Sequence, residues 1–315
     1  MDQVRSRPTI KLGLMGFGQI GRMIYQLAQH QPDIEITAIA DIGEPHILCY
    51  LLQRTDSPGE VPWDTFGVDL VIEATGQFRD RASLEAHLHA GSPRVLARTL
   101  PTELIDRIIV PGINESSINP HDRIISAGSA TFGAAALLLQ AVTGVAPVDS
   151  VSITSIHSYS SDQPVQDYAG SDYRRSRSAA ENIIPNTHEA GNWLPSLLPH
   201  LEGRVTTSAL NVPIQRGSLL DVSLAFSDDS ITVDAVNDAI RSAARSRPEL
   251  VQVSEDPIVS SDVIGQSCTV LFDAPGTIKA GNRMIKLLGW YENLGHAARL
   301  LDVARLYTEL EAAGV

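Results

Sequence analysis

The chain has 315 residues, of which 43% are hydrophobic and 19% charged, a composition typical of folded globular proteins rather than disordered or membrane-embedded ones. Its 37 acidic and 24 basic residues give a net charge of −13, which argues against nucleic acids and anionic membranes as partners. Two cysteines, Cys49 and Cys268, are too few for a disulfide framework or a structural zinc site, and we expect no metal. The amino terminus lacks the apolar core of a signal peptide, so we expect a cytoplasmic protein.

The first half of the chain alternates short apolar strands with helices. We expect helices at residues 19–31, 46–53 and 81–90, and strands at residues 10–16, 34–41, 69–75, 94–97, 107–110 and 123–126. Strands that are apolar along their whole length are typical of a parallel sheet covered on both faces. The first half is therefore predicted to be a doubly wound α/β domain.

The second half is richer in long strands. A largely apolar helix is expected at 130–145 and a further helix at 233–245, among strands at 150–158, 218–225, 267–273 and 283–290. This pattern predicts an α+β domain with a mainly antiparallel sheet. We expect one domain over residues 1–129 and a second over 130–295, with an amphipathic helix at 296–315 that packs back on the first.

A glycine-rich turn opens the first predicted helix, where Gly16-Phe17-Gly18-Gln19-Ile20-Gly21 matches G-x-G-x-x-G directly after a strand. In that context, backbone N–H groups and the helix dipole hold a pyrophosphate. Asp41 closes the second predicted strand, 20 residues after Gly21, where a carboxylate accepts hydrogen bonds from the ribose diol of an adenosine. The same carboxylate repels a 2′-phosphate, so the pattern predicts NAD rather than NADP as the cofactor.

Further motifs follow one another along nearly the whole chain. They are LGLMGFGQIGR, VIEATGQF, IISAGSATFGAAALLLQ, SIHSYSSDQ, DYRRSRSAAENIIP, IVSSDVIGQ and WYENLGH. In this order they resemble the glyceraldehyde-3-phosphate dehydrogenase family. The resemblance implies a Rossmann NAD-binding domain followed by a catalytic domain, a homotetramer, and NAD-dependent oxidation of an aldehyde through a covalent cysteine adduct. It also implies that the basic loop around Arg174, Arg175 and Arg177 crosses a subunit interface.

The resemblance also implies roles for individual residues. His157, in SIHSYSSDQ, matches the histidine that removes a proton from the substrate, and is our candidate general acid/base. Asn293, in WYENLGH, matches the residue that orients the nicotinamide carboxamide. Thr75 and Gly76 lie in the VIEATGQF segment, and Arg98 stands where the family usually has a small residue near the nicotinamide ribose. These four residues join the glycine-rich turn and Asp41 as expected cofactor-binding residues.

The position of the family's nucleophile is occupied by Ala130, in Ser126-Ala127-Gly128-Ser129-Ala130-Thr131. A methyl group cannot add to a carbonyl, so this chain is not expected to form the covalent adduct. Cys49 and Cys268 are both interpreted as packed, inert thiols. Two explanations stay open: an engineered replacement of the cysteine, or a native loss of the covalent mechanism. Phe132 and Gly133 also depart from the family pattern, which favours the second without excluding the first.

The expected substrate pocket has changed as well. Positions that match the family's substrate and phosphate site carry Ser129, Thr131, Ser160, Asp162 and Arg175. The family's S-T-G motif has become Thr187-His188-Glu189, and the arginine of its F-R-V-P motif has become Asn211. A carboxylate beside a phosphate oxygen is unfavourable, and the arginine fork has been lost. We therefore expect a non-phosphorylated, amide-bearing or cationic substrate, with Glu189 either as its counter-ion or facing solvent.

Two functions are consistent with these residues. The first is an NAD-dependent oxidoreductase that acts on an aldehyde or alcohol carbon, with His157 as general acid/base. The alternative is a catalytically inactive NAD-binding or assembly protein of the same fold. Retention of both His157 and Asn293 favours the enzyme, because a protein that only binds NAD needs neither.

Overall fold

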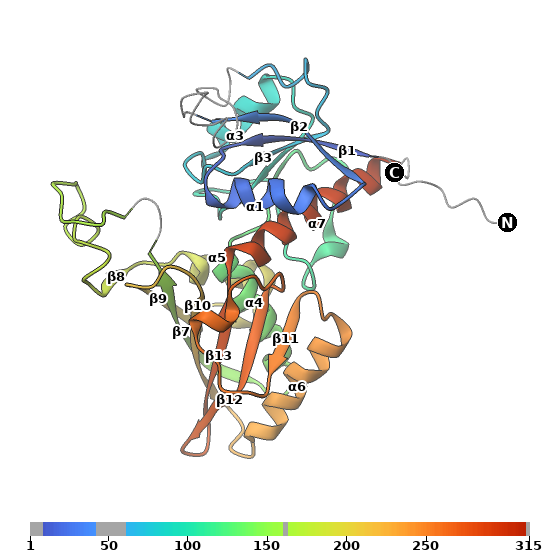
Figure 1. Ribbon diagram of the computed structural model, residues 1–315. Helices are drawn as coiled ribbons and strands as arrows, with labels where there is room; N and C mark the ends of the chain where they lie inside the picture. Colours follow the sequence, from blue (N-terminus) through green and yellow to red (C-terminus); the bar gives the residue numbers. More distant parts are fainter. Residues whose placement is uncertain (1–8, 42–60, 160–162, 313–315) are drawn as a thin grey trace. The chain divides into compact units, whose positions relative to one another are not determined.

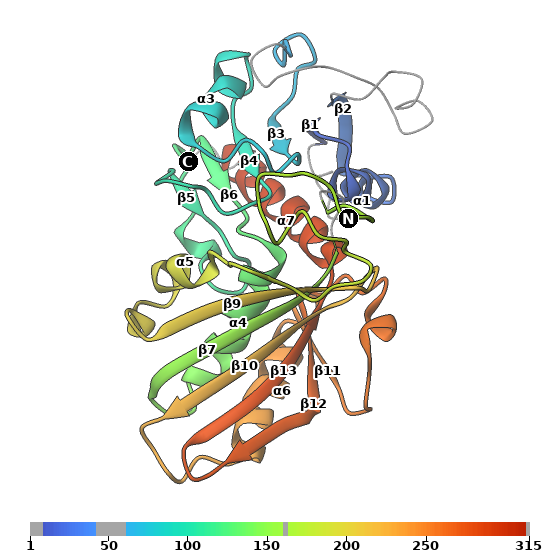
Figure 2. The same cartoon turned by 90° about the vertical axis from the view of Figure 1, so that its left-hand side faces the viewer.

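The computed structural model describes residues 9–41, 61–159 and 163–312 (Figures 1 and 2). The chain forms two compact units, one made of Met1–Ser129 with Ala297–Val315 and the other of Ala130–His296. No helix in these described ranges has the length and apolar character needed to cross a bilayer. The helix predicted at 46–53, which contains Cys49, lies outside the described residues.

The first unit is built on a six-stranded sheet in the order β2-β1-β3-β4-β6-β5, and all neighbouring pairs are parallel. Its central strands are buried along nearly their whole length, as expected for a sheet covered on both faces. This confirms the predicted doubly wound parallel sheet. The strands are β1 (Ile10–Met15), β2 (Ile34–Ala40), β3 (Leu70–Glu73), β4 (Val95–Ala97), β5 (Arg107–Ile108) and β6 (Ile124–Ser126).

Within the described residues, two helices make crossovers of this sheet. α1 (Gln19–Ala28) connects β1 to β2, and α3 (Arg81–His89) connects β3 to β4. The two crossovers lead away from the central β1–β3 pair in opposite directions, so right-handed connections place α1 and α3 on opposite faces. The carboxyl edge of β1 and β3 is therefore the crevice in which such sheets bind a ligand. α1 ends earlier than predicted, because Pro32 disfavours helical backbone at the residue before it.

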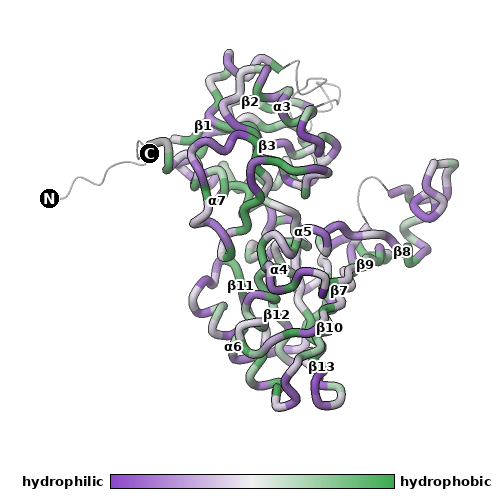
Figure 3. Tube along the Cα trace, turned by 180° about the vertical axis from the view of Figure 1, so that it is seen from behind, coloured by the Kyte–Doolittle hydropathy of each residue, from purple (hydrophilic) through white to green (hydrophobic). Residues whose placement is uncertain are grey.

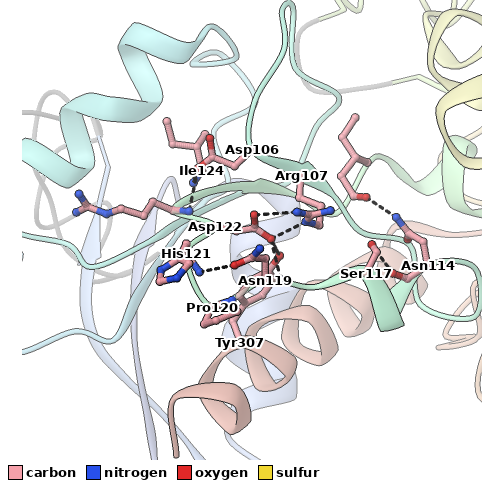
Figure 4. A network of polar contacts seen from close by, with 12 residues as sticks. Asp106, Arg107, Asn114, Ser117, Asn119, Pro120, His121, Asp122, Ile124 and Tyr307 are labelled. Atoms are coloured by element: carbon pink, nitrogen blue, oxygen red, sulfur yellow. Dashed lines mark hydrogen bonds and ion pairs between the residues drawn. The ribbon is translucent and has the colours of Figure 1, made fainter. Parts of the chain in front are cut away.

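The carboxyl-terminal helix α7 (Asn293–Ala312) is held to the first unit from Ala297 onward by two polar clusters. Figure 4 shows the first, in which the Tyr307 hydroxyl donates to Asp122 Oδ2 at 2.7 Å and Arg107 Nε donates to the same oxygen at 2.6 Å. In the second, Arg305 Nε donates to Asp33 Oδ2 at 2.7 Å. Because Tyr307 and Asp122 are both buried, the helix docks through a polar contact inside the core.

The second unit contains a seven-stranded mixed sheet in the order β11-β12-β13-β10-β7-β9-β8. The β7–β9 and β11–β12 pairs are parallel and the other neighbours are antiparallel, in agreement with the predicted, mainly antiparallel sheet. The strands are β7 (Val148–Ser158), β8 (Ile184–Asn186), β9 (Val205–Val212), β10 (Ser218–Phe226), β11 (Val251–Ser254), β12 (Val270–Ala280) and β13 (Met284–Tyr291).

Three helices belong to this unit: α4 (Ala130–Thr143), α5 (Ala190–Leu197) and α6 (Val233–Ser246). α4 consists mostly of hydrophobic residues (Figure 3) and is buried along most of its length. It packs against α5, α6 and the sheet. The second unit also contains the short 3₁₀ helices η2 (Pro199–Leu201) and η3 (Ser260–Val263). A third 3₁₀ helix, η1 (Glu115–Ser117), lies in the first unit.

Four elements of the second unit are absent from our sequence-based prediction: α5, β8, β9 and β11. α5 carries Pro195 inside a single short helix, which weakens its helical pattern. β9 alternates exposed polar residues with its buried ones and lacks a strong apolar run, and β8 and β11 are only a few residues long. β9 pairs with β7, β8 pairs with β9 and β11 pairs with β12, so these strands depend on pairing rather than on local sequence.

Alternation along the strands decides which side chains face the helices. In β7 the buried series Val151, Ile153 and Ser155 continues to His157, because alternate residues of a strand share a face. In β13 the series of Ile285, Leu287 and Gly289 continues in the same way to Tyr291. β7, β9 and β13 run in the same direction, so their last residues meet at one edge of the sheet.

We expect Tyr307→Phe to lower the free energy of unfolding by about 1–3 kcal/mol, because it leaves the buried Asp122 carboxylate short of a donor. Urea unfolding of the purified protein measures this. Phe66→Tyr is the matched control, since Phe66 is 44% exposed and adding a hydroxyl group there should change stability by less than about 0.5 kcal/mol. Equal stabilities for the Tyr307 variant and the native chain would show that the buried bond does not hold α7.

Candidate active site

Each of the three glycines in the glycine-rich turn between β1 and α1 meets one steric requirement of a pyrophosphate site. Gly16 has a φ of +90°, and a Cβ there would lie 2.7 Å from the backbone nitrogen of Thr75. A Cβ at Gly21 would lie 2.2 Å from the Gly16 carbonyl oxygen, so this position permits close packing of helix on strand. Nothing lies within 4 Å of a Cβ built at Gly18, which leaves room for a ligand to approach the backbone.

The other residues of the turn are also compatible with a bound anion. Gly18 precedes the first turn of α1 and has no side chain to cap it, so the amino-terminal N–H groups of the helix can be satisfied by an anion. Gln19 is exposed, whereas Phe17 and Ile20 are buried and anchor the turn. The residues present therefore fit a dinucleotide pyrophosphate.

Asp41 directly follows β2 and reaches the glycine-rich turn. Its Oδ2 accepts a hydrogen bond from the backbone N–H of Phe17 at 2.5 Å. The carboxylate is thereby fixed beside the turn, at the end of the strand next to β1. This is the side of the sheet on which the adenosine half of a dinucleotide lies in such folds, as the sequence predicted for Asp41.

On the other side of β1, the segment after β3 forms a second tight turn. Gly76 has a φ of +77°, and a Cβ there would lie 2.3 Å from Arg98 Nη2. Arg98 follows β4, and the same Nη2 donates to the Thr75 carbonyl at 3.0 Å. Thr75, Gly76 and Arg98, all predicted from their motifs, thus lie together at the carboxyl edge of the parallel sheet.

In the second unit, His157 lies in a cluster of hydroxyl groups at the shared edge of β7 and β13. The Tyr291 hydroxyl lies 3.1 Å from His157 Nδ1 and 2.9 Å from Thr131 Oγ1. His157 Nε2 is hydrogen-bonded to Ser155 Oγ. The sequence predicted His157 and Thr131 as site residues but not Ser155 or Tyr291. The signal for both was the period of two along their strands, which puts them on the face of His157.

The protonation states of the cluster follow from its burial. Burial, and then the neighbouring His188, lower the pKa of His157 to about 4, so the imidazole is neutral near pH 7. Burial raises the pKa of Tyr291 to about 12, so the phenol keeps its proton. The cluster therefore joins a neutral imidazole to a phenol and two further hydroxyl groups.

Ala130 is the first residue of α4, next to Thr131 in this cluster. It is partly exposed, so a methyl group stands at the start of the helix. Phe132 is fully buried in the same helical turn, and a Cβ at Gly133 would contact Thr269 at 3.3 Å. Cys268 is buried, 3% exposed, two residues before the first residue of β12.

A network of amides and a second histidine adjoin the cluster. Asn211, the inward-facing residue opposite His157 in the β7–β9 pair, donates from Nδ2 to Gln163 Oε1 at 3.1 Å. Asn186 Nδ2 donates to Asn211 Oδ1 at 3.3 Å. The His188 ring stacks on that of His157 with 5.9 Å between centroids, and its Nδ1 accepts from the Ala190 N–H at 3.0 Å. Neither Gln163 nor Asn186 was predicted.

The pKa of His188 is lowered as well. Burial is the main cause, and the carboxylate of Glu189 opposes it. Glu189 itself is exposed at the start of α5. His188 and Asn211, both predicted as substrate-binding residues, therefore lie in a group of two neutral imidazoles and several amides.

The remaining predicted residues are more dispersed. Arg175 is partly exposed in a turn closed by Asp172, whose Oδ1 accepts its backbone N–H at 3.0 Å. Ser129 ends the first unit, and Asn293 opens α7. Ser160 and Asp162 lie outside the described residues. Over the part of the chain that the structure covers, no group of three or more potential metal ligands is found.

Comparison with known proteins gives the family. The family model described as "Glyceraldehyde 3-phosphate dehydrogenase, C-terminal domain" matches residues 129–293, and that of the "NAD binding domain" matches residues 10–57. Glyceraldehyde-3-phosphate dehydrogenase 1 of Streptomyces avermitilis is 34% identical over 95% of this chain and 98% of its own length. The enzyme of Geobacillus stearothermophilus is 32% identical over 94% and 97%. The chain therefore belongs to the NAD-dependent glyceraldehyde-3-phosphate dehydrogenase family, as its motifs predicted.

Proposed function

We propose that this protein is an NAD-dependent oxidoreductase that exchanges a hydride with an alcohol, aldehyde or aldehyde-hydrate carbon without forming a covalent enzyme adduct. The observation that carries the proposal is the neutral cluster of His157, Tyr291 and Thr131 beside the methyl group of Ala130. NAD, when bound, supplies the hydride acceptor or donor. The glycine-rich turn and Asp41 would hold its pyrophosphate and adenosine ribose.

His157 is the proposed general base in the direction of oxidation. As the C–H bond delivers its hydride, the O–H proton of the alcohol or hydrate passes to the neutral imidazole, so charge and atoms balance. Ser155 and Tyr291 occupy its ring nitrogens with hydroxyl groups. Tyr291 also fixes the ring plane, because it is held in turn by Thr131.

The substrate that we propose is not phosphorylated. The amide groups of Asn211, Asn186 and Gln163 bond to one another, and His188 is neutral near pH 7. Amides and neutral imidazoles complement hydroxyl and amide groups, whereas a phosphate dianion needs cationic donors. The exposed Glu189 carboxylate beside His188 further favours an uncharged or cationic substrate.

We infer that alanine is the native residue at position 130. Phe132 is packed with no exposed surface, and Gly133 is packed against Thr269. Both depart from the family pattern that accompanies the cysteine, and both are accommodated in a close-packed helix. An engineered change of residue 130 alone would have left the family's usual residues at positions 132 and 133. Their departure therefore supports divergence of the whole segment. The codon for residue 130 in the source gene tests this directly.

A second candidate is a binding or assembly protein that has lost catalysis. One observation favours it: both ring nitrogens of His157 are already hydrogen-bonded within the unit. Production of NADH from a panel of alcohols, aldehydes and polyols separates the two. Turnover by the native chain that falls in the His157→Asn variant supports the enzyme, and unchanged NAD binding with no turnover supports the binding protein.

The protein is also proposed to be a cytoplasmic homo-oligomer, a tetramer by membership of its family. Val165, Tyr168, Tyr173 and Ile183 are large apolar side chains exposed on one segment of the second unit. Surfaces of this kind mark sites of association. Light scattering coupled to gel filtration should give four chains per particle, and Tyr173→Glu should reduce that number because it puts a charge on the apolar segment. A monomeric native protein would contradict the assignment.

The low pKa of His157 predicts the acid limb of the pH–rate profile. Because the folded protein keeps the imidazole neutral down to about pH 4, kcat should fall only near that value and not at the ordinary 6.5. The same shift affects stability, because the unfolded chain binds a proton between pH 6.5 and 4 that the folded chain does not. The stabilisation is present above pH 6.5 and is lost as the pH falls through 4.

The variant that checks this pH dependence is His157→Asn, which should lower kcat by about 10²–10⁴-fold and reduce the stability change in that pH window, to which the buried His188 also contributes. The matched control is His200→Asn, because His200 is exposed at η2. An acid limb near 6.5, or a variant with full activity, would rule out His157 as the base.

Ala130→Cys should create a reactive thiol. The amino terminus of α4 favours the thiolate through the helix dipole, so alkylation at neutral pH should be at least about tenfold faster than for a thiol inside a helix. Peptide mapping after iodoacetamide treatment measures the rate at residue 130. Ala298→Cys provides the comparison, since Ala298 is also partly exposed but lies within α7. Equal rates would mean that residue 130 does not occupy a nucleophile position.

A further inference from the structure

A buried acid–imidazole pair lies beneath the turn that follows β3. Glu73, the last residue of β3, is 1% exposed, and His87 of α3 is completely buried. Glu73 Oε2 lies 3.2 Å from His87 Nε2. Burial of a carboxylate is costly unless hydrogen bonds compensate it, so the groups that surround Glu73 indicate what the carboxylate does.

The second oxygen of Glu73 is directed at the cofactor turn. Oε1 accepts the backbone N–H of Thr75 at 2.8 Å and also the Thr75 hydroxyl. One oxygen therefore meets His87, and the other holds Thr75 twice. The Thr75 carbonyl accepts from Arg98, and its backbone nitrogen lies against Gly16 of the pyrophosphate turn. Hydrogen bonds from Thr75 to Glu73 and from Arg98 to Thr75 thus hold the Thr75–Gly76 turn.

The His87 side chain makes one polar contact within the described residues. Its ring packs against Trp63 with 6.0 Å between centroids, and Nδ1 has no hydrogen-bond partner in the described ranges. The remaining ring nitrogen is the one that meets Glu73. A buried imidazole that packs against Trp63 and meets a carboxylate through Nε2 orients that carboxylate.

The strand order determines which half of NAD this turn serves. A dinucleotide lies across the carboxyl edge of a doubly wound sheet, with its pyrophosphate at β1. Asp41 follows β2 on one side of β1, and the Thr75–Gly76 turn follows β3 on the other. If the adenosine half lies on the β2 side, the nicotinamide half extends over β3 and β4.

We propose that Glu73 and His87 are positioning residues that fix the Thr75–Gly76 turn for the nicotinamide half of NAD. His87 holds the Glu73 carboxylate, the carboxylate holds Thr75, and the turn receives the nicotinamide. This inference rests on the proposed place of Thr75 and Gly76 in the cofactor site. It does not depend on the identity of the substrate or on catalysis.

The test compares two ligands of the full-length protein by calorimetry: NAD, and ADP-ribose, which lacks the nicotinamide. In His87→Leu, the Kd of NAD should rise about tenfold, as expected for a lost charge-assisted contact, and that of ADP-ribose less than about twofold. His89→Leu is the matched control, because His89 lies two residues further along α3 and is exposed. It should bind both ligands like the native chain.

The ratio of the two affinities separates positioning from general destabilisation. Equal weakening of NAD and ADP-ribose, or an unchanged ratio, would overturn the proposal. If His87→Leu does not fold, Glu73→Gln decides, because a neutral amide oxygen is a weaker acceptor than the carboxylate for the two Thr75 donors. Its NAD to ADP-ribose ratio of Kd values should rise about threefold, and a native ratio would overturn the proposal. Failure of the native chain to turn over any alcohol or aldehyde would contradict the proposed function and leave this binding test intact.

Discussion

The contact between Tyr291 and His157 determines what the second unit can do. It exists because β7 and β13 run in the same direction and end at the same edge of the sheet, with both side chains on the helix-covered face. Thr131 joins the contact from the first turn of α4. Burial then keeps the imidazole neutral and the phenol protonated. With no thiol at Ala130, the chemistry that these groups can supply is transfer of a proton to or from an oxygen, which is what direct hydride exchange requires.

The first unit depends on a different constraint, the close approach of backbone segments at the carboxyl edge of a parallel sheet. Gly16 and Gly21 permit contacts that any side chain would block, and Gly18 leaves the ligand side open. The carboxylates of Asp41 and Glu73 each accept a backbone N–H of a cofactor turn, one on either side of β1. Two acidic side chains thus order two turns at the carboxyl edge of the sheet.

Much of this organisation was accessible from the sequence. Apolar strands with no alternation predicted the parallel sheet, and the glycine pattern with Asp41 predicted a site that the structure makes feasible. The motif order predicted the family. What local sequence did not contain was pairing over long distances: β9 becomes a strand because it pairs with β7, and Asn211 comes to lie opposite His157 through that pairing. The environment of His157 was missed for the same reason, since Ser155 and Tyr291 reach it through strand alternation and register. Glu73 and His87 were not identified as a pair because fourteen residues and a change of element separate them in sequence.

The central claim is that hydride exchange proceeds here without a cysteine. The most direct measurement is NADH formation from a panel of alcohols, aldehydes and aldehyde hydrates after exhaustive alkylation of the native protein with iodoacetamide, with intact-mass analysis of the enzyme during turnover. The account predicts turnover that survives alkylation and shows no covalent adduct. Activity abolished by alkylation, or an acyl group found on the enzyme during turnover, would contradict it.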